Sequence, residues 1–243
     1  MDVGQGDAIL IQLPDGPQVL IDAGADNSVL FGLGEALPWW DRSIEYAVVT
    51  HPDLDHFGGF FGVAEKYSIE RFIYNGDVDK ILFKMLHESV EARNIPSLII
   101  DQGYALEWPS GVTLHFVWPR AGYESDDTNA RSLVALLTWN DATMLLTGDL
   151  PVVQEQMLLQ SYPDLHAQVL KVGHHGSKGS SGLVFLEAIR PELCIISVGR
   201  DNSFGHPHPE ALRRLEAVGC QVRSTVDVGT VTVWSDGSSP FRE

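Results

Sequence analysis

The chain has 243 residues, 44% of them hydrophobic, so it can bury a sizeable core, and no run of about 18 apolar residues predicts a membrane span. Its 16 Lys and Arg against 33 Asp and Glu give a formal net charge of −17 at pH 7. This balance argues against a broad basic surface that holds nucleic acid through its phosphates. If the substrate is an anion, bound cations must attract it.

The cysteine content and the amino terminus give information about the cellular compartment and the domain organisation of the chain. Cys194 and Cys220 are too few for a disulfide scaffold, and we expect two buried free thiols, with one bridge as the alternative in an oxidising compartment. No basic segment precedes an apolar stretch at the amino terminus, so no signal peptide is predicted. We expect a single domain over residues 1–243. Its abrupt start from Met1 is compatible with excision from a longer, membrane-bound parent.

Apolar runs in the first half of the chain predict alternating strands and helices. Residues 8–13 and 18–21 flank a Pro-Asp-Gly-Pro turn and predict a β-hairpin, followed by a mixed loop that contains Trp39 and Trp40. Strands are then predicted at 46–50, 71–74 and 98–100, and helices at 60–67 and 80–93.

The second half continues with strands and then repeats the alternation. A strand is predicted at 113–118, and a hairpin joins 132–139 to 143–147 through Asn140-Asp141. After it we predict strands at 168–172 and 193–198, helices at 183–189 and 209–218, and a terminal strand pair at 221–224 and 230–234. Strands with interspersed helices in both halves predict an α/β protein in which two sheets pack face to face and helices cover the outside.

The segment His51-Pro-Asp-Leu-Asp-His56 is the strongest chemical signal. It follows an apolar strand, precedes Gly58-Gly59, and places two imidazoles and two carboxylates within six positions. On a tight loop such spacing aims alternate side chains at one point, as a divalent metal requires. The alternative is a solvated acidic loop that caps the next helix. The density of ligand types favours the metal site.

Four other polar segments also stand at strand ends or where a strand is expected. Asp149 ends a strand in Thr-Gly-Asp, and as a lone residue it could equally cap a helix. His174 and His175 stand between glycines, where they have no helix face on which to pack, which favours a ligand role. His206 and His208 alternate with prolines, and His206 is the better candidate. The opening Asp-Val-Gly-Gln-Gly-Asp is the fourth segment.

These motifs together resemble a known family. HPDLDH before Gly-Gly is similar to the HxHxDH signature of the metallo-β-lactamase superfamily, and TGD resembles its bridging-aspartate motif. The combination of DVGQGDA, LIDAG, HxDxDH, LLTGD, LKVGHHGS and GHP resembles the β-lactamase-like domain of ComEC/Rec2 DNA internalisation competence proteins, from Asp2 to about Gly237. The resemblance implies a four-layer αββα sandwich of two mixed sheets flanked by helices.

Carried over by position, the resemblance assigns roles. It implies that His51 and Asp53 bind one metal, that Asp55 and His56 bind the other, and that Asp149 bridges them. One of His174 and His175 would complete the second metal's shell, and the other, or His206, would support a ligand or protonate the leaving group. We therefore name Asp55, His175 and His206 as catalytic candidates. The residues expected to support the ligands or line the cleft are Asp2, Gln5, Asp7, Asp22, Asn129, Ser132, Ser177 and Lys178.

Two departures from the family pattern concern the first metal. Asp53 stands where most members carry a histidine, and the histidine that normally precedes the TGD strand has no counterpart. Asn129 and Ser132 are the nearest candidates there, since His115 comes too early. Carboxylate and amide oxygens make a site harder, which favours Mn²⁺ or Mg²⁺ more than imidazoles alone would. We expect two divalent ions, Zn²⁺ or Mn²⁺, with Mg²⁺ also compatible.

Three functional hypotheses follow. The first is a nuclease that cleaves DNA, single-stranded DNA above all, during uptake, with two cations sharing an activated hydroxide. The second is a hydrolase of small esters, such as a phosphorylcholine esterase, cyclic phosphodiesterase or lactonase. The third is a weakly active metal-binding module that docks DNA or a channel domain of the same parent. A ComEC-like parent implies the extracytoplasmic face of the membrane, and a free-standing relative implies the cytoplasm.

Basic residues beside the motifs offer little help in choosing among these hypotheses. They could hold a phosphate backbone, but we expect ordinary surface charges. The residues concerned are Arg131, Lys171, Lys178 and Arg200.

Overall fold

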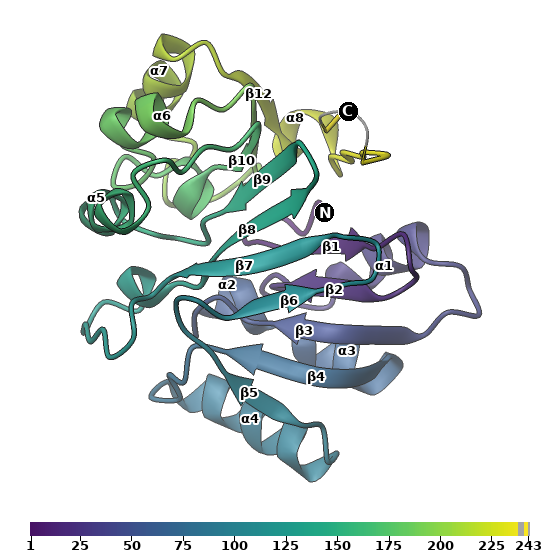
Figure 1. Ribbon diagram of the computed structural model, residues 1–243. Coiled ribbons are helices and arrows are strands. Elements are labelled where there is room, and N and C mark those ends of the chain that lie inside the picture. Colours follow the sequence, from purple (N-terminus) through teal and green to yellow (C-terminus); the bar gives the residue numbers. More distant parts are fainter. Residues whose placement is uncertain (238–240, 243) are drawn as a thin grey trace.

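The computed structural model describes residues 1–237, 241 and 242, and it arranges them in layers around two packed sheets (Figure 1). The first sheet has five strands in the order β1 to β5. Its members are β1 (Ile9–Gln12), β2 (Gln18–Ile21), β3 (Ser43–Val48), β4 (Ser68–Tyr74) and β5 (Ser97–Ile99). The predicted hairpin is confirmed as β1 and β2, which pair antiparallel, whereas β2 to β5 run parallel.

The second sheet has seven strands in the order β12-β11-β10-β9-β8-β7-β6. They are β6 (Ala105–Glu107), β7 (Thr113–Trp118), β8 (Val134–Trp139), β9 (Ala142–Leu146), β10 (Val169–Lys171), β11 (Leu193–Ile196) and β12 (Gln221–Ser224). Strands β6 to β9 pair antiparallel, and β9 to β12 pair parallel. The expected mixed sheets are therefore confirmed.

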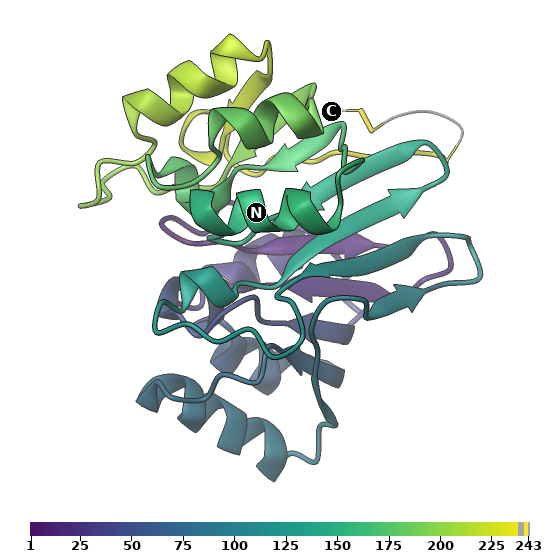
Figure 2. The ribbon, with the colours of Figure 1, turned by 60° about the vertical axis from the view of Figure 1, so that its left-hand side comes forward.

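Helices cover the outer face of each sheet (Figure 2). The first sheet carries α1 (Val29–Ala36), α2 (Leu54–Phe57), α3 (Phe60–Lys66) and α4 (Ile81–Ala92). The second carries α5 (Val152–Ser161), α6 (Leu183–Ile189) and α7 (Pro209–Ala217), and α8 (Thr225–Val228) follows β12. Short 3-10 turns are η1 (Asn129–Arg131) and η2 (Gly173–Gly176). Over the described residues, no helix combines the length and apolar character needed to span a membrane.

Successive side chains of a strand point to opposite faces of its sheet, so each sheet contributes to two apolar cores, one on each face. Along β2, Val19 and Ile21 face the second sheet, and Leu20 between them packs with the helices on the outside. The same division occurs in the second sheet, where Met144 faces the first sheet and Leu145 packs toward α5 and α6. Three apolar layers thus separate four layers of secondary structure, as the resemblance implies.

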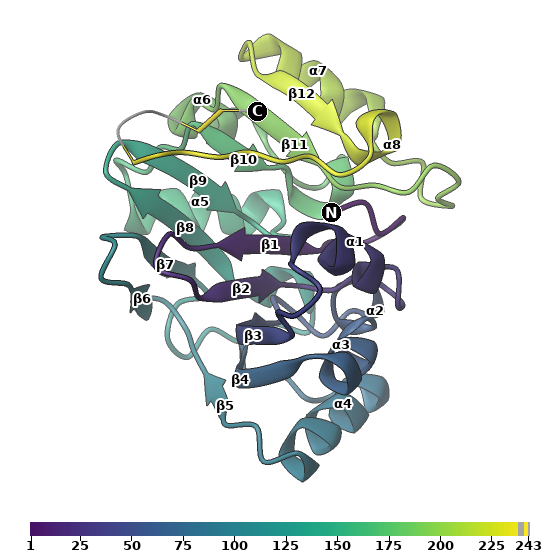
Figure 3. The ribbon, with the colours of Figure 1, turned by 90° about the vertical axis from the view of Figure 1, so that its right-hand side faces the viewer.

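Two element predictions need correction. Residues 29–36, expected as loop, form α1, which buries Val29 and Leu33 one turn apart. Residues 230–234, expected to pair with 221–224, form no strand: within the described part of the chain, their only ladder contact is an isolated bridge from Trp234 to Arg242. Their alternating apolar residues instead cover the open side of the core between the sheets, where the segment runs beside β1 (Figure 3).

The expectation of two free thiols is also wrong, because Cys194 and Cys220 form a disulfide. Cys194 lies in β11 and Cys220 immediately precedes β12, and parallel pairing of these strands brings their Cα atoms to 6.0 Å. A separation of 26 positions in the sequence gave no sign of this proximity.

We expect reduction of this disulfide to lower the free energy of unfolding by about 3 kcal/mol, because the bond closes a long loop in the unfolded chain. Urea unfolding with and without a reductant measures the change. The Cys194→Ala, Cys220→Ala double variant is the control and should not respond to reductant. An unchanged midpoint in the wild type, with both thiols shown to be free by titration, would contradict the expectation.

Candidate metal centre

Loops at the carboxyl ends of parallel strands from both sheets bring the polar motifs together. Asp22 follows β2 and His51 follows β3 in the first sheet. Asp149 follows β9 and His175 follows β10 in the second. Because the carboxyl ends of parallel neighbours share one edge of a sheet, each sheet contributes two adjacent loops to one cluster.

Asp149 is the centre of this cluster. Its Oδ2 lies within 4 Å of the Nε2 atoms of four histidines: His56 at 3.4 Å, His174 at 3.6 Å, His175 at 3.7 Å and His51 at 3.9 Å. Burial would raise the pKa of Asp149, but His56 and His175 outweigh it and hold the pKa well below its ordinary value. One ionised carboxylate therefore faces histidines from both sheets, as a bridging ligand would.

Buried atoms without partners test whether this cluster suits metal ions. Nε2 of His51, His56 and His175, and Oδ1 of Asp149, are buried and have no hydrogen-bond partner among the described residues. Buried polar atoms are normally paired, so a convergent set of unpaired donor atoms suits the binding of a metal ion. His51, His56 and Asp149 offer atoms within 4.8 Å of one another, as do Asp55, His56 and His175. Imidazole and carboxylate donors suit Zn²⁺ or Mn²⁺.

The electrostatics of the cluster also favour a bound cation. Burial lowers the pKa of a histidine, yet the Asp149 and Asp7 carboxylates outweigh it at His175 and raise its pKa to about 9. At His51, burial and the neighbouring His56 prevail, and the pKa falls to about 3. The carboxylates thus draw positive charge to the His175 side of the cluster, where a divalent ion can replace the proton.

Asp22, from the LIDAG motif, supports His56 from behind. Its Oδ2 lies 2.8 Å from Nδ1 of His56, and its two oxygens accept hydrogen bonds from the backbone N–H and the hydroxyl of Thr50, each at 2.8 Å. A carboxylate on Nδ1 fixes the ring so that Nε2 points into the cluster. On this contact we propose for Asp22 the orienting role that the resemblance implies.

We expect Asp22→Asn to weaken metal binding by about 10- to 100-fold. The amide would hold the His56 ring less firmly and would make its Nε2 a weaker ligand for the metal. Isothermal titration with Zn²⁺ or Mn²⁺ measures the affinity. Asp26→Asn, at an exposed position of the same loop, is the matched control. Equal metal affinities for the two variants would show that Asp22 does not orient His56 for metal binding.

The two histidines of the Gly-His-His-Gly motif diverge because of their backbone. His174 and His175 have φ angles of 50° and 53°, in the left-handed region that residues other than glycine seldom occupy. His175 is buried, with Nε2 3.3 Å from Oδ2 of Asp55, whereas the His174 side chain is 32% exposed. The structure therefore places His175 beside Asp55 and His174 at the mouth of the cluster. Such local strain is typical of functional sites.

On the His51 side of the cluster, the predicted ligand Asp53 is engaged by residues outside the cluster. Oδ1 of Asp53 lies 3.8 Å from Nε2 of His51, but it also lies 2.5 Å from Nζ of Lys80 and accepts a hydrogen bond from Thr128 at 2.7 Å. The Lys80 ammonium thus neutralises a predicted ligand. Sequence reasoning missed Lys80 and Thr128, which stand 27 and 75 positions from Asp53 and carry no motif.

Lys171 is buried, so the expectation of a surface charge is wrong for it. Its Nζ lies 2.8 Å from Oδ2 of Asp7, and Oδ1 of Asp7 lies 3.3 Å from Nδ1 of His175, which also contacts the carbonyl of Ser197 at 3.0 Å. Burial would raise the pKa of Asp7, but Lys171 outweighs it and holds the pKa below its ordinary value. Asp7 and Ser197 thereby orient His175.

Other predicted residues fall into two groups. Three contact the cluster or its loops: Ser132 lies 3.3 Å from His51 Nδ1, Asn129 lies 3.5 Å from His174 Nδ1, and Gln5 accepts a hydrogen bond from Gly199. Of the remaining three, Ser177 donates its backbone N–H to the carbonyl of His174 at 2.8 Å, whereas Asp2 accepts a hydrogen bond from Gly4 and Lys178 is exposed.

His206 lies beside the mouth of the cluster. Its ring centroid is 5.5 Å from that of His174, at 78°. Burial, together with His174 and His175, lowers its pKa to about 4. The structure thus brings His206 close to the cluster, while His208 caps α7 by accepting a hydrogen bond from Glu210.

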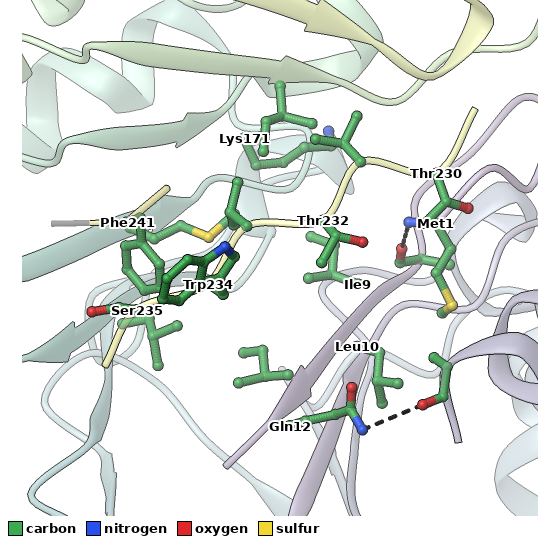
Figure 4. Close-up of a pocket in the computed structure, with 18 of the residues that line it drawn as sticks. Met1, Ile9, Leu10, Gln12, Lys171, Thr230, Thr232, Trp234, Ser235 and Phe241 are labelled. Atoms are coloured by element: carbon green, nitrogen blue, oxygen red, sulfur yellow. Dashed lines mark hydrogen bonds between the residues drawn. The ribbon is translucent and has the colours of Figure 1, made fainter. Parts of the chain in front are cut away.

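An apolar cavity of about 460 Å³ lies beside Lys171, and no candidate metal ligand lines it (Figure 4). Residues of β1 and of the segment 230–235 line it, among them Ile9, Leu10 and Trp234. The stem of Lys171 also lines it, while the ammonium of Lys171 pairs with Asp7. Lys171 therefore separates apolar space from the polar centre.

Comparisons with known proteins agree with this geometry. A family model described as Metallo-beta-lactamase superfamily matches residues 1–200. ComE operon protein 3 of Bacillus subtilis is 29% identical over 249 residues, covering 95% of this chain and 32% of that protein. Competence protein ComA of Neisseria gonorrhoeae is 31% identical over 226 residues, covering 92% and 30% respectively. The chain thus spans about a third of the length of these relatives.

Solved structures share the fold. The metallo-beta-lactamase fold protein YhfI from Bacillus subtilis superposes with a TM-score of 0.62 at 12% identity, covering 90% of this chain and 88% of that one. At this identity the similarity establishes the arrangement of sheets and helices alone.

Proposed function

The chain belongs to the metallo-β-lactamase superfamily, whose members are generally metal-dependent hydrolases, and on this basis we propose that it is a metal-dependent nuclease that cleaves phosphodiester bonds of single-stranded DNA. The observation that carries the proposal is the set of buried, unpaired donor atoms around Asp149. A set of this kind has no structural use of its own, because leaving it unpaired destabilises the fold.

Two divalent ions, Zn²⁺ or Mn²⁺, fit the donors. Asp55, His56 and His175 would hold one, His51 and Asp53 the other, and Asp149 would serve both. When bound, such ions lower the pKa of water to about 7 and offset the charge of a phosphodiester. They would also supply the positive charge that a chain of net charge −17 lacks.

The protein's own residues orient this centre and handle the proton. Asp22 fixes His56, and Asp7 fixes His175. The leaving oxygen needs a proton, and we assign this transfer to His174, whose ring adjoins that of His206 at the mouth of the cluster. His206, with a pKa of about 4, is uncharged near neutral pH and is a poor acid there.

The relatives support DNA as the substrate, since one is named a competence protein. The chain matches about a third of their length, which supports a domain that works beside a channel domain of a larger protein. The disulfide favours an oxidising compartment, and thus the extracytoplasmic face of the membrane.

The proposal is tested with end-labelled single-stranded and double-stranded DNA in Mn²⁺ or Zn²⁺, comparing the wild type with an Asp55→Ala, Asp149→Ala variant. We expect metal-dependent cleavage of the single strand by the wild type alone. The absence of DNA cleavage with either metal would contradict the nuclease proposal. Parallel assays with bis-p-nitrophenyl phosphate, a lactone and a lactam would then distinguish a hydrolase of small esters from a weakly active docking module.

A further inference from the structure

The loop after β11 presents an aromatic ring beside the mouth of the metal cluster. Phe204 is 64% exposed, and its ring stacks on that of His206 with centroids 5.8 Å apart and an interplanar angle of 23°. His206 adjoins His174, whose Nε2 lies 3.6 Å from Asp149. Phe204 is thus connected to the proposed metal bridge through two rings, with much of its own ring open to solvent.

This position is held by a network and does not depend on Phe204 itself. Oδ1 of Asn202 accepts hydrogen bonds from the backbone N–H groups of Phe204 at 3.2 Å and His206 at 2.9 Å. Nδ2 of Asn202 donates to the carbonyls of Gly199 at 2.8 Å and His206 at 2.7 Å. One side chain therefore fixes both ends of the loop. An ordered loop that exposes a large apolar ring loses the stabilisation that burying the ring would give.

The charge of the chain determines what such a ring can contribute. A chain of net charge −17 repels a phosphate backbone and gains little from ionic contacts outside the metal centre. Stacking on an aromatic ring is independent of charge, and it is how proteins hold bases of single strands, which are not covered by a complementary strand.

Resting on the proposed nuclease function, we propose that Phe204 is a nucleobase-stacking residue. It binds a base of single-stranded DNA that flanks the phosphodiester at the metal centre, and it extends a stack formed with His206. The substrate class is therefore single-stranded DNA with unpaired bases, in preference to a duplex or a small ester.

Equilibrium binding tests the contact without relying on cleavage. The probe is a fluorescent oligothymidylate with phosphorothioate links, which resist hydrolysis, and anisotropy is measured with the metal-loaded protein. We expect Phe204→Ala to weaken binding by about tenfold and Phe204→Trp to bind as tightly as the wild type or tighter. Phe31→Ala is the matched control, because Phe31 is an 81% exposed ring on α1. It should bind as the wild type does.

An abasic oligonucleotide separates base contacts from backbone contacts. It has the same phosphates without bases, so we expect wild type and Phe204→Ala to bind it equally. Metal content and urea unfolding should be unchanged in all variants, since Phe204 touches no donor atom.

Each other outcome has a defined meaning. Equal binding of oligothymidylate by wild type and Phe204→Ala, or equal losses with the abasic strand, would overturn the stacking proposal, and so would a wild type that binds neither strand. Tight, Phe204-dependent binding without any cleavage would refute the nuclease function and leave the stacking contact standing.

Discussion

Asp149→Asn is expected to lower kcat/KM for single-stranded DNA by on the order of 10³-fold or more, because both proposed metal positions would lose the charged ligand that we propose they share. The amide keeps the shape of the side chain but removes the negative charge that four histidine nitrogens face. Metal content, measured by atomic emission on dialysed protein, should fall from two ions per chain to one or none.

The control for this prediction is Asp141→Asn, at the exposed turn position immediately before β9. It should retain both metal content and activity. Two ions bound to Asp149→Asn with wild-type affinity would show that the carboxylate is not a bridging ligand. The metal assignment to the other residues would then have to be redrawn.

Lys171→Met is expected to destabilise the fold by about 3–5 kcal/mol, the cost of leaving one partner of a buried ion pair without the other. Methionine fills the space of the lysine stem, so the loss comes from the Asp7 carboxylate, which is 1% exposed. Urea unfolding of the metal-free protein measures the free energy of unfolding. The control is Lys178→Met, at an exposed lysine immediately after the motif that contains Lys171, and it should change the free energy of unfolding by less than about 0.5 kcal/mol.

A double-mutant cycle decides whether the pair itself is responsible. Adding Asp7→Asn to Lys171→Met removes the unpaired charge and should recover most of the lost stability. The metal affinity of the double variant should be lower than that of the wild type, because an amide at position 7 orients His175 less firmly than a carboxylate does. If the two single changes prove additive in stability, Lys171 and Asp7 do not act as a pair.

The sequence allowed correct prediction of most strands, and it indicated candidate site residues where ligand-type side chains directly follow an apolar run. Strands could be predicted from apolar runs, and most of the motif residues cluster because they follow such strands, although Asp7 precedes β1. Asp149 illustrates the limit of this reasoning. As a lone residue it could equally have been a helix cap. Only the other motifs, and their resemblance to a known family, identified it as a candidate metal ligand. The structure then adds that four histidine nitrogens surround its Oδ2.

Features that depend on distant pairing could not be predicted. Lys80 reaches Asp53 because α4 begins beside the metal loop, and nothing in the sequence connects these positions. Lys171 does have a local signal, since it stands within an apolar run, after Val169 and Leu170, but only its contact with Asp7 explains why it is buried. The disulfide likewise depends on β11 and β12 being neighbours.

The contacts that complete the centre join opposite ends of the chain. The hydroxyl of Ser197 donates to the carbonyl of Gly6 across 191 positions, and Gly199 donates to Gln5 across 194. A Cβ on Gly6 would collide with the carbonyl of Asp55, so the first loop also fits tightly against the metal loop. Contacts of such separation close large loops and form slowly during folding. The donor set is therefore complete only when nearly the whole chain has folded, and acquisition of metal would serve as a late kinetic marker of the native state.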